Sequence, residues 1–237
     1  RHRVPHRLHT AHCEGGGERH RLFWREDEIQ LHAFRAVGDV EFVTRSTAIP
    51  DHNIECQETL ERGIPLLSRA EILAQICKQK SSLVVSGTHG KTTTSSMLAL
   101  ALRSAEMKPS FIIGGDVNEV GTGAAWDDGS LFVVEGDESD GSFLLLPRDY
   151  AVVTNVEADH LEHHGGYEAL EEAFEKFVEE TSGPVIVGID DDGGKKLASS
   201  QNAISLGMDS SAEWRITELE ESWTGVSFNL KDPDNHE

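Results

Sequence analysis

The chain has 237 residues, of which 38% are hydrophobic and 27% charged, a balance typical of a globular protein with a sizeable core. Its 42 acidic and 21 basic side chains give a net charge of −21, which repels phosphate backbones and argues against a nucleic-acid partner. No stretch approaches the roughly 18 consecutive apolar residues of a membrane-spanning helix. Three cysteines at unrelated spacings favour reduced thiols over a disulfide framework.

Residues 1–36 differ in composition from the chain that follows. They are rich in arginine and histidine, show no regular helical or strand period, and lack the apolar segment of a secretory signal. We expect an unassigned leader here, disordered or mistranslated. A zinc-binding stripe is the alternative, but a proline interrupts the helical spacing and no carboxylate partner is evident. The histidines of that stripe are His2, His6, His9 and His12.

Residues 37–80 alternate between strand-like and helix-like segments. Residues 40–44 alternate apolar and polar side chains, as a half-buried strand does. Asn53 to Arg62 have the pattern of a helix that Gly63 ends. A short apolar run, residues 64–67, precedes a second helical pattern. This alternation is typical of an α/β layer with parallel strands.

Residues 81–237 continue the alternation and predict an α/β fold with a mainly parallel sheet. Strands are expected at residues 82–86, 111–113, 131–134, 150–154 and 184–187. Helices are expected at residues 92–106 and 167–180, and the second has an apolar face. Residues 214–217 and 226–230 are expected to form antiparallel strands around a turn.

The strongest motif is Gly87-Thr88-His89-Gly90-Lys91-Thr92-Thr93-Thr94, between a predicted strand and a predicted helix. Glycines let backbone N–H groups approach phosphate oxygens, and the helix N-terminus adds positive potential. Lys91 can neutralise phosphate charge, and the Thr92 hydroxyl can bind Mg²⁺. Val85 stands where the general phosphate-loop pattern has its first glycine. The plainer alternative, a glycine-rich turn with an incidental lysine, is disfavoured by the strand before it and the helix after it.

Two further polar segments follow predicted strands. One is Glu135-Gly136-Asp137-Glu138-Ser139-Asp140, and the other is Thr154-Asn155-Val156-Glu157-Ala158-Asp159-His160. Ligands of open parallel sheets lie outside the carboxyl ends of the strands, so all three motifs should converge on one edge. Each segment alone is more typical of a solvated loop. Together they predict a site where carboxylates hold Mg²⁺ beside phosphates.

In this order, the three motifs resemble those of the Mur ligase family. Residues 46–55 and 62–71 resemble the end of that family's N-terminal domain, and residues 111–115 resemble its glycine-rich substrate loop. The resemblance covers residues 37–188. It implies that residues 37–80 are the end of a Rossmann-like N-terminal domain that binds the UDP-linked substrate. It also implies that residues 81–237 belong to the central ATP-binding P-loop domain.

The resemblance implies an ATP-dependent ligase of peptidoglycan precursor synthesis. Such enzymes activate the carboxylate of UDP-N-acetylmuramate as an acyl phosphate, and an amino group then displaces phosphate. The segment Glu138-Ser139-Asp140-Gly141-Ser142-Phe143-Leu144 favours L-alanine as the amino substrate. Such enzymes work in the cytoplasm, where ATP and UDP-linked precursors are found, and the lack of an export signal agrees with that location.

Position by position, the resemblance assigns roles to individual residues. It implies catalytic roles for Lys91 and His160, and His89 either touches substrate or is simply the family's turn residue. It implies that the loop around ATP consists of Gly87, Thr88, His89, Gly90, Lys91, Thr92 and Thr93. The Mg²⁺ ligands that it implies are Thr92, Glu135 and His160.

Two departures from the family pattern bear on activity. Residues 1–36 lack the strand and glycine-rich loop that hold the UDP group, and the chain ends before the family's later G-x-H-N segment and its C-terminal domain. We therefore expect a truncated central domain that does not turn over substrate alone. Two alternatives stay open: a sister ligase that adds another amino acid or a peptide, and a non-catalytic nucleotide-binding module.

Overall fold

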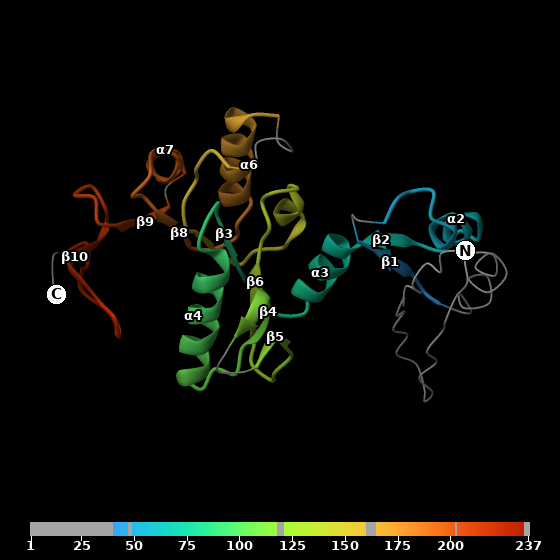
Figure 1. The fold of residues 1–237 in the computed structure, drawn as a ribbon, viewed down its shortest axis with the longest axis horizontal. Coiled ribbons are helices and arrows are strands. Elements are labelled where there is room, and N and C mark those ends of the chain that lie inside the picture. Colours follow the sequence, from blue (N-terminus) through green and yellow to red (C-terminus); the bar gives the residue numbers. More distant parts are fainter. Residues whose placement is uncertain (1–39, 47–48, 118–120, 160–164, 202, 235–237) are drawn as a thin grey trace, which may run out of the picture. The chain divides into compact units, whose positions relative to one another are not determined.

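The computed structural model describes residues 40–46, 49–117, 121–159, 165–201 and 203–234 (Figure 1). The chain divides into two compact units, with the boundary between Arg69 and Ala70. The assignment of residues 37–80 and 81–237 to two domains of the family stays a prediction. The early histidines and His160 lie outside the described residues. None of the helices formed by the described residues has the length and hydrophobicity needed to cross a bilayer.

The first unit contains a small parallel sheet. Strand β1 (Val43–Arg45) pairs with β2 (Leu66–Ser68), and helix α2 (Ile54–Glu61) connects them. The Asn53 side chain caps α2 by accepting hydrogen bonds from the backbone of Glu55 and Cys56. The strand predicted over residues 40–44 is observed as the shorter β1, which begins and ends later in the chain. It has three residues because β2 offers only three partners for pairing.

The second unit is built on a nine-stranded sheet with the order β11-β10-β9-β8-β7-β3-β6-β4-β5 (Figure 1). Its strands are β3 (Ser81–Ser86), β4 (Ser110–Val117), β5 (Thr122–Ala125), β6 (Leu131–Glu135), β7 (Tyr150–Val153), β8 (Val185–Gly188), β9 (Ile204–Gly207), β10 (Trp214–Ser222) and β11 (Gly225–Lys231). Neighbouring strands are parallel except in the pairs β4–β5 and β10–β11. The prediction of an α/β fold with a mainly parallel sheet is confirmed.

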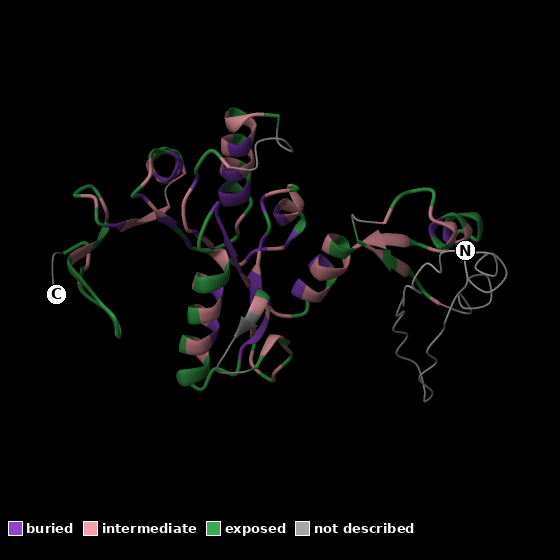
Figure 2. Ribbon diagram, in the orientation of Figure 1, coloured by how far each residue is buried: buried purple, intermediate pink, exposed green. Residues whose placement is uncertain are grey.

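Alternating side chains of the central strands fill two separate cores. Val133 of β6 packs with Phe111 and Ala99, under helix α4 (Lys91–Ser104). Its neighbours Phe132 and Val134 belong to the larger core, because successive side chains of a strand point to opposite faces. That core is covered by α3 (Arg69–Cys77), the 3₁₀ helix η1 (Ser142–Leu145), α6 (Tyr167–Glu179) and α7 (Asp192–Ser200). Figure 2 shows the central strands largely buried and the β10–β11 hairpin largely exposed.

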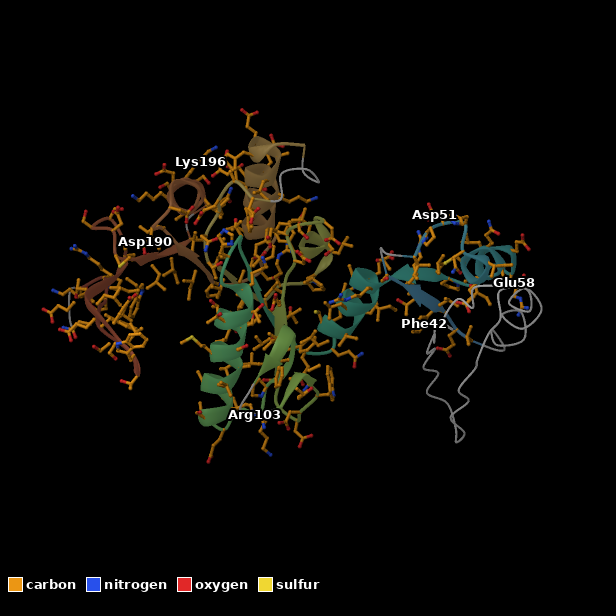
Figure 3. The ribbon with its side chains drawn as sticks, in the orientation of Figure 1. Phe42, Asp51, Glu58, Arg103, Asp190 and Lys196 are labelled. Atoms are coloured by element: carbon orange, nitrogen blue, oxygen red, sulfur yellow. The ribbon has the colours of Figure 1, made fainter. Side chains whose placement is uncertain are left out.

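Four elements of the second unit are absent from the sequence prediction: β5, η1, α7 and β9. Helix α7 is tied to α6 by Lys196, whose ammonium group lies 2.8 Å from a carboxylate oxygen of Glu171 (Figure 3). The turn before α7 is tied to the end of β9 by Asp190, whose carboxylate accepts hydrogen bonds from the backbone of Met208 and Asp209. The predicted antiparallel strands β10 and β11 are present and longer than expected.

Candidate nucleotide site

The three motifs meet at the carboxyl edge of the sheet. Strand β3 lies between β6 and β7, and the registers align Val85 with Glu135 and Ser86 with Val153. The residues that follow these strands therefore leave the sheet side by side. The convergence expected from the sequence is confirmed for the described residues of the three motifs.

The glycine-rich loop turns directly from β3 into α4. Gly87 and Gly90 both have positive φ angles, 133° and 80°, which disfavour residues with a side chain. Gly90 is the N-cap of α4 and provides no side-chain cap, so N–H groups of the first turn stay available to an anion. The helix dipole adds positive potential at this end, and Arg103 lies in the last turn at the opposite end (Figure 3).

Residues after β7 hold this loop through its backbone. Thr154 Oγ1 and Asn155 Nδ2 both donate to the carbonyl oxygen of His89, at 2.6 and 3.1 Å. Asn155 Oδ1 accepts from His89 N at 2.8 Å. The buried Thr88 hydroxyl accepts from Glu157 N at 2.9 Å. These hydrogen bonds fix the shape of the loop, while the His89 imidazole, 58% exposed, faces outward with Nε2 4.0 Å from Asp159 Oδ2.

Lys91 crosses the loop to a buried carboxylate. Its ammonium group donates to the carbonyl oxygens of Gly87 and Thr88, at 2.8 and 3.2 Å. It also lies 2.9 and 2.8 Å from the two carboxylate oxygens of Glu138. The Lys91 side chain is 16% exposed, and the Glu138 side chain is 2% exposed. The expected phosphate-binding cation is therefore already held in a fixed position at the start of α4.

Thr92 and Glu135, two of the three implied Mg²⁺ ligands, are brought together. Thr92 Oγ1 donates to Glu135 Oε1 at 3.1 Å, and Glu135 Oε2 accepts from Gly114 N at 2.9 Å. A hydroxyl and a carboxylate are the oxygen donors that Mg²⁺ prefers, so these two residues fit that cation. Within the described ranges, no group of three or more His, Cys, Asp or Glu side chains could hold a metal. The third implied ligand, His160, lies outside them and stays a prediction.

Sequence reasoning left three residues of the site without a role. Glu138 and Asn155 stand inside quoted motifs, and Gly114 stands inside the resembling glycine-rich segment. A Cβ on Gly114 would lie 2.9 Å from Glu135 Oε1, so a side chain here would require the carboxylate to shift away from the Gly114 N–H. No local signal singles out Glu138, because Asp137 and Asp140 stand in the same acidic segment after β6.

Comparison with known proteins agrees with this geometry. A family model described as the Mur ligase middle domain matches residues 85–237. A UDP-N-acetylmuramate–L-alanine ligase of Saccharopolyspora erythraea is 50% identical over 165 residues, which are 69% of this chain and 34% of that relative. Another of the same name, from Mycolicibacterium vanbaalenii, is 47% identical over 173 residues, 72% of this chain and 36% of the relative. The chain thus spans about a third of the length of these curated relatives.

A solved structure has a similar fold. The UDP-N-acetylmuramate-alanine ligase of Thermotoga maritima superposes with a TM-score of 0.71 at 25% identity, covering 83% of this chain and 45% of that one. The family match includes β3 from Val85 onward, the glycine-rich loop, α4 and both acidic segments, which are the elements that form the site. The chain belongs to the Mur ligase family.

Proposed function

We propose that this chain supplies the ATP site of a ligase that joins L-alanine to the carboxylate of UDP-N-acetylmuramate. The observation that carries the proposal is the position of Lys91, Thr92 and Glu135 around the N-terminus of α4, at the carboxyl edge of the sheet. That edge is where open α/β sheets bind ligands, and a helix N-terminus favours phosphate. Relatives named for this reaction, 40–50% identical, support the choice of reaction.

The chemistry requires two anions to react. The substrate carboxylate attacks the γ-phosphate of ATP to form an acyl phosphate, and the amino group of L-alanine then displaces phosphate. In this proposal Lys91 and the α4 N-terminus orient the phosphates, while Thr92 and Glu135 hold Mg²⁺ with His160 as the third ligand. The bound cation supplies positive charge that offsets the repulsion between phosphate and carboxylate. Because ATP and UDP-linked precursors are cytoplasmic, the proposed location is the cytoplasm.

Calorimetric titration of the chain with MgATP tests the nucleotide site. We expect binding to the wild-type chain and a loss of at least about tenfold in affinity for Lys91→Ala, since a charge-assisted bond to phosphate is removed. Lys108→Ala is the control, because Lys108 follows α4 and takes no part in the loop. Equal affinity in the wild-type chain and Lys91→Ala would overturn the proposed role of the loop.

A chimaera tests the reaction itself. Residues 85–237 would replace the matching segment of the 50% identical L-alanine ligase from Saccharopolyspora erythraea. We expect ATP-dependent formation of UDP-N-acetylmuramoyl-L-alanine and release of ADP, and we expect both to disappear with Lys91→Ala. A folded chimaera that binds MgATP but forms no product with L-alanine would contradict the proposed reaction while leaving the ATP site standing.

A further inference from the structure

Val156 stands between the two residues that hold the glycine-rich loop by its backbone and by Thr88. Before it, the Asn155 side chain binds the N–H and the carbonyl oxygen of His89, and the Asn155 carbonyl oxygen accepts from Thr88 N at 3.2 Å. After it, the backbone of Glu157 makes two hydrogen bonds with the Thr88 hydroxyl, at 2.9 and 3.3 Å. The position of the Val156 backbone therefore sets the position of the loop.

The Val156 backbone is itself bound by two side chains from outside the three motifs. Asp191 Oδ1 accepts from Val156 N at 3.2 Å and from Gly194 N at 2.8 Å, so the same carboxylate also caps α7. Tyr167, the first residue of α6, donates its hydroxyl to the Val156 carbonyl oxygen at 3.1 Å. Both polar backbone groups of this residue are thus satisfied by side chains, and Val156 is 2% exposed in the larger core.

Close packing at the start of α7 keeps these three residues together. A Cβ on Gly193 would lie 2.9 Å from Val156 Cβ and 2.5 Å from the Tyr167 hydroxyl oxygen, and closer still to the Val156 carbonyl oxygen. The first turn of α7 therefore lies directly against the Val156 backbone. An acceptor for the N–H and a donor for the carbonyl oxygen, both on packed helices, leave this peptide segment one orientation.

We propose that Asp191 and Tyr167 are positioning residues of the nucleotide site. They fix the backbone of Val156, and through Asn155 and Glu157 they hold the glycine-rich loop in the shape that receives phosphate. The inference rests on the proposed ATP site and goes beyond it, because it extends the residues on which phosphate binding depends to α6 and α7. A site that binds an anion through backbone N–H groups needs such support, since small displacements of the loop misalign those donors.

Tyr167→Phe is the first test, because it removes one hydroxyl and keeps the ring at the start of α6. We expect the His89 N–H, which Asn155 Oδ1 accepts, to exchange with solvent deuterium about fivefold faster. The affinity for MgATP in calorimetric titration should fall about fivefold, the effect of one lost hydrogen bond. Tyr150→Phe is the matched control, since Tyr150 begins β7 and is 40% exposed, and it should change neither quantity.

Asp191→Ala is the second test and does not depend on the first variant. We expect the affinity for MgATP to fall about fivefold, and Asp191→Asn, whose amide oxygen can still accept from Val156 N, should restore it to within about twofold. Because Asp191 and Tyr167 fix the same backbone, their effects should overlap. The double variant Tyr167→Phe/Asp191→Ala should bind about tenfold more weakly than the wild-type chain, short of the roughly 25-fold product of two independent losses.

A role confined to anchoring α6 and capping α7 predicts a different result. The variants would then unfold at lower urea concentration but keep the wild-type exchange rate at His89 and the wild-type affinity for MgATP. That result, or losses that multiply in the double variant, would overturn the inference, while binding of MgATP to the wild-type chain would uphold the proposed function. No binding of MgATP to the wild-type chain would overturn both proposals.

Discussion

Gly87 and Thr154 approach each other so closely that no side chain fits between them. A Cβ on Gly87 would lie 2.9 Å from the backbone nitrogen of Thr154 and closer still to its hydroxyl oxygen. This approach joins the end of β3 to the end of β7 and allows Thr154 and Asn155 to bind the backbone of His89. The shape of the glycine-rich loop therefore depends on Gly87, because only a hydrogen atom fits where another residue would have its Cβ.

Replacing Gly87 should thus damage both stability and binding. We expect Gly87→Ala to lower the free energy of unfolding by about 3 kcal/mol, since it combines a strained φ of 133° with a backbone collision. Gly90→Ala is the matched comparison, because its φ is also positive but nothing lies within 4 Å of the new Cβ. It should cost only about 1–2 kcal/mol. Urea unfolding measures both, and equal losses would contradict the proposed contact between the two strand ends.

Substitution of Thr92 should weaken the binding of ATP with Mg²⁺ more than the binding of ATP without it. Thr92→Val keeps the shape but removes the hydroxyl that faces Glu135 Oε1. We expect MgATP affinity to fall about tenfold, the loss of roughly one ligand contact, while affinity for ATP in EDTA changes little. Thr92→Ser restores the hydroxyl and should restore MgATP binding. Similar losses with and without Mg²⁺ would argue that Thr92 contacts phosphate and not the cation.

The central part of the fold and the positions of the site were predictable because their signals are local. The apolar run of β3, the glycines at residues 87 and 90 and the helical pattern of α4 follow one another without interruption. The polar segments after β6 and β7 converge because parallel strands share a carboxyl edge, which is a general property of the architecture. The ion pair between Lys91 and Glu138 could not be predicted, since several acidic residues of that segment were equally placed in the sequence.

Two of the missed elements, α7 and β5, have sequences whose local preference opposes their structure. Helix α7 begins Asp192-Gly193-Gly194, and paired glycines are typical of a turn. A Cβ at Gly193 would collide with the carbonyl oxygen of Val156, and one at Gly194 with that of Gly188, so close packing requires both glycines. Strand β5 contains Gly123 for the same reason, because it lies against the carbonyl oxygens of β4. Tertiary contacts, which a local sequence pattern does not reveal, therefore determine the secondary structure of these segments.

Arg148 should contribute strongly to the stability of the second unit. Its side chain is 2% exposed and donates to the carbonyl oxygens of Phe143, Leu144, Leu146 and Phe177, so it joins η1 to the end of α6. Burial lowers the pKa of its guanidinium, and Glu180 at 3.1 Å acts in the opposite direction. We expect Arg148→Met to lower the free energy of unfolding by about 3 kcal/mol, because several buried carbonyls lose their donor.

Lys176→Met is the matched control for that variant. Lys176 also approaches Glu180, at 3.8 Å, but its side chain is 57% exposed. Exposed ion pairs contribute little, so the change should stay within about 0.5 kcal/mol. Urea unfolding compares the two, and comparable losses would mean that the shared partner Glu180, and not the carbonyl network, accounts for the effect of Arg148.

Deprotonation of the Cys77 thiol should lower the free energy of unfolding at alkaline pH. Its side chain is fully buried in the larger core, and burial raises the pKa of the thiol from 9.0 to about 11. A thiol whose pKa is higher in the folded state deprotonates first in the unfolded chain, so its contribution is complete below pH 9 and is lost as the pH rises toward 11. Between pH 8 and pH 10 the wild-type chain should lose about 1.4 kcal/mol more than Cys77→Ala in urea unfolding. Because the other alkaline groups are common to both proteins, parallel pH profiles would mean that the Cys77 thiol titrates alike in the folded and unfolded chains.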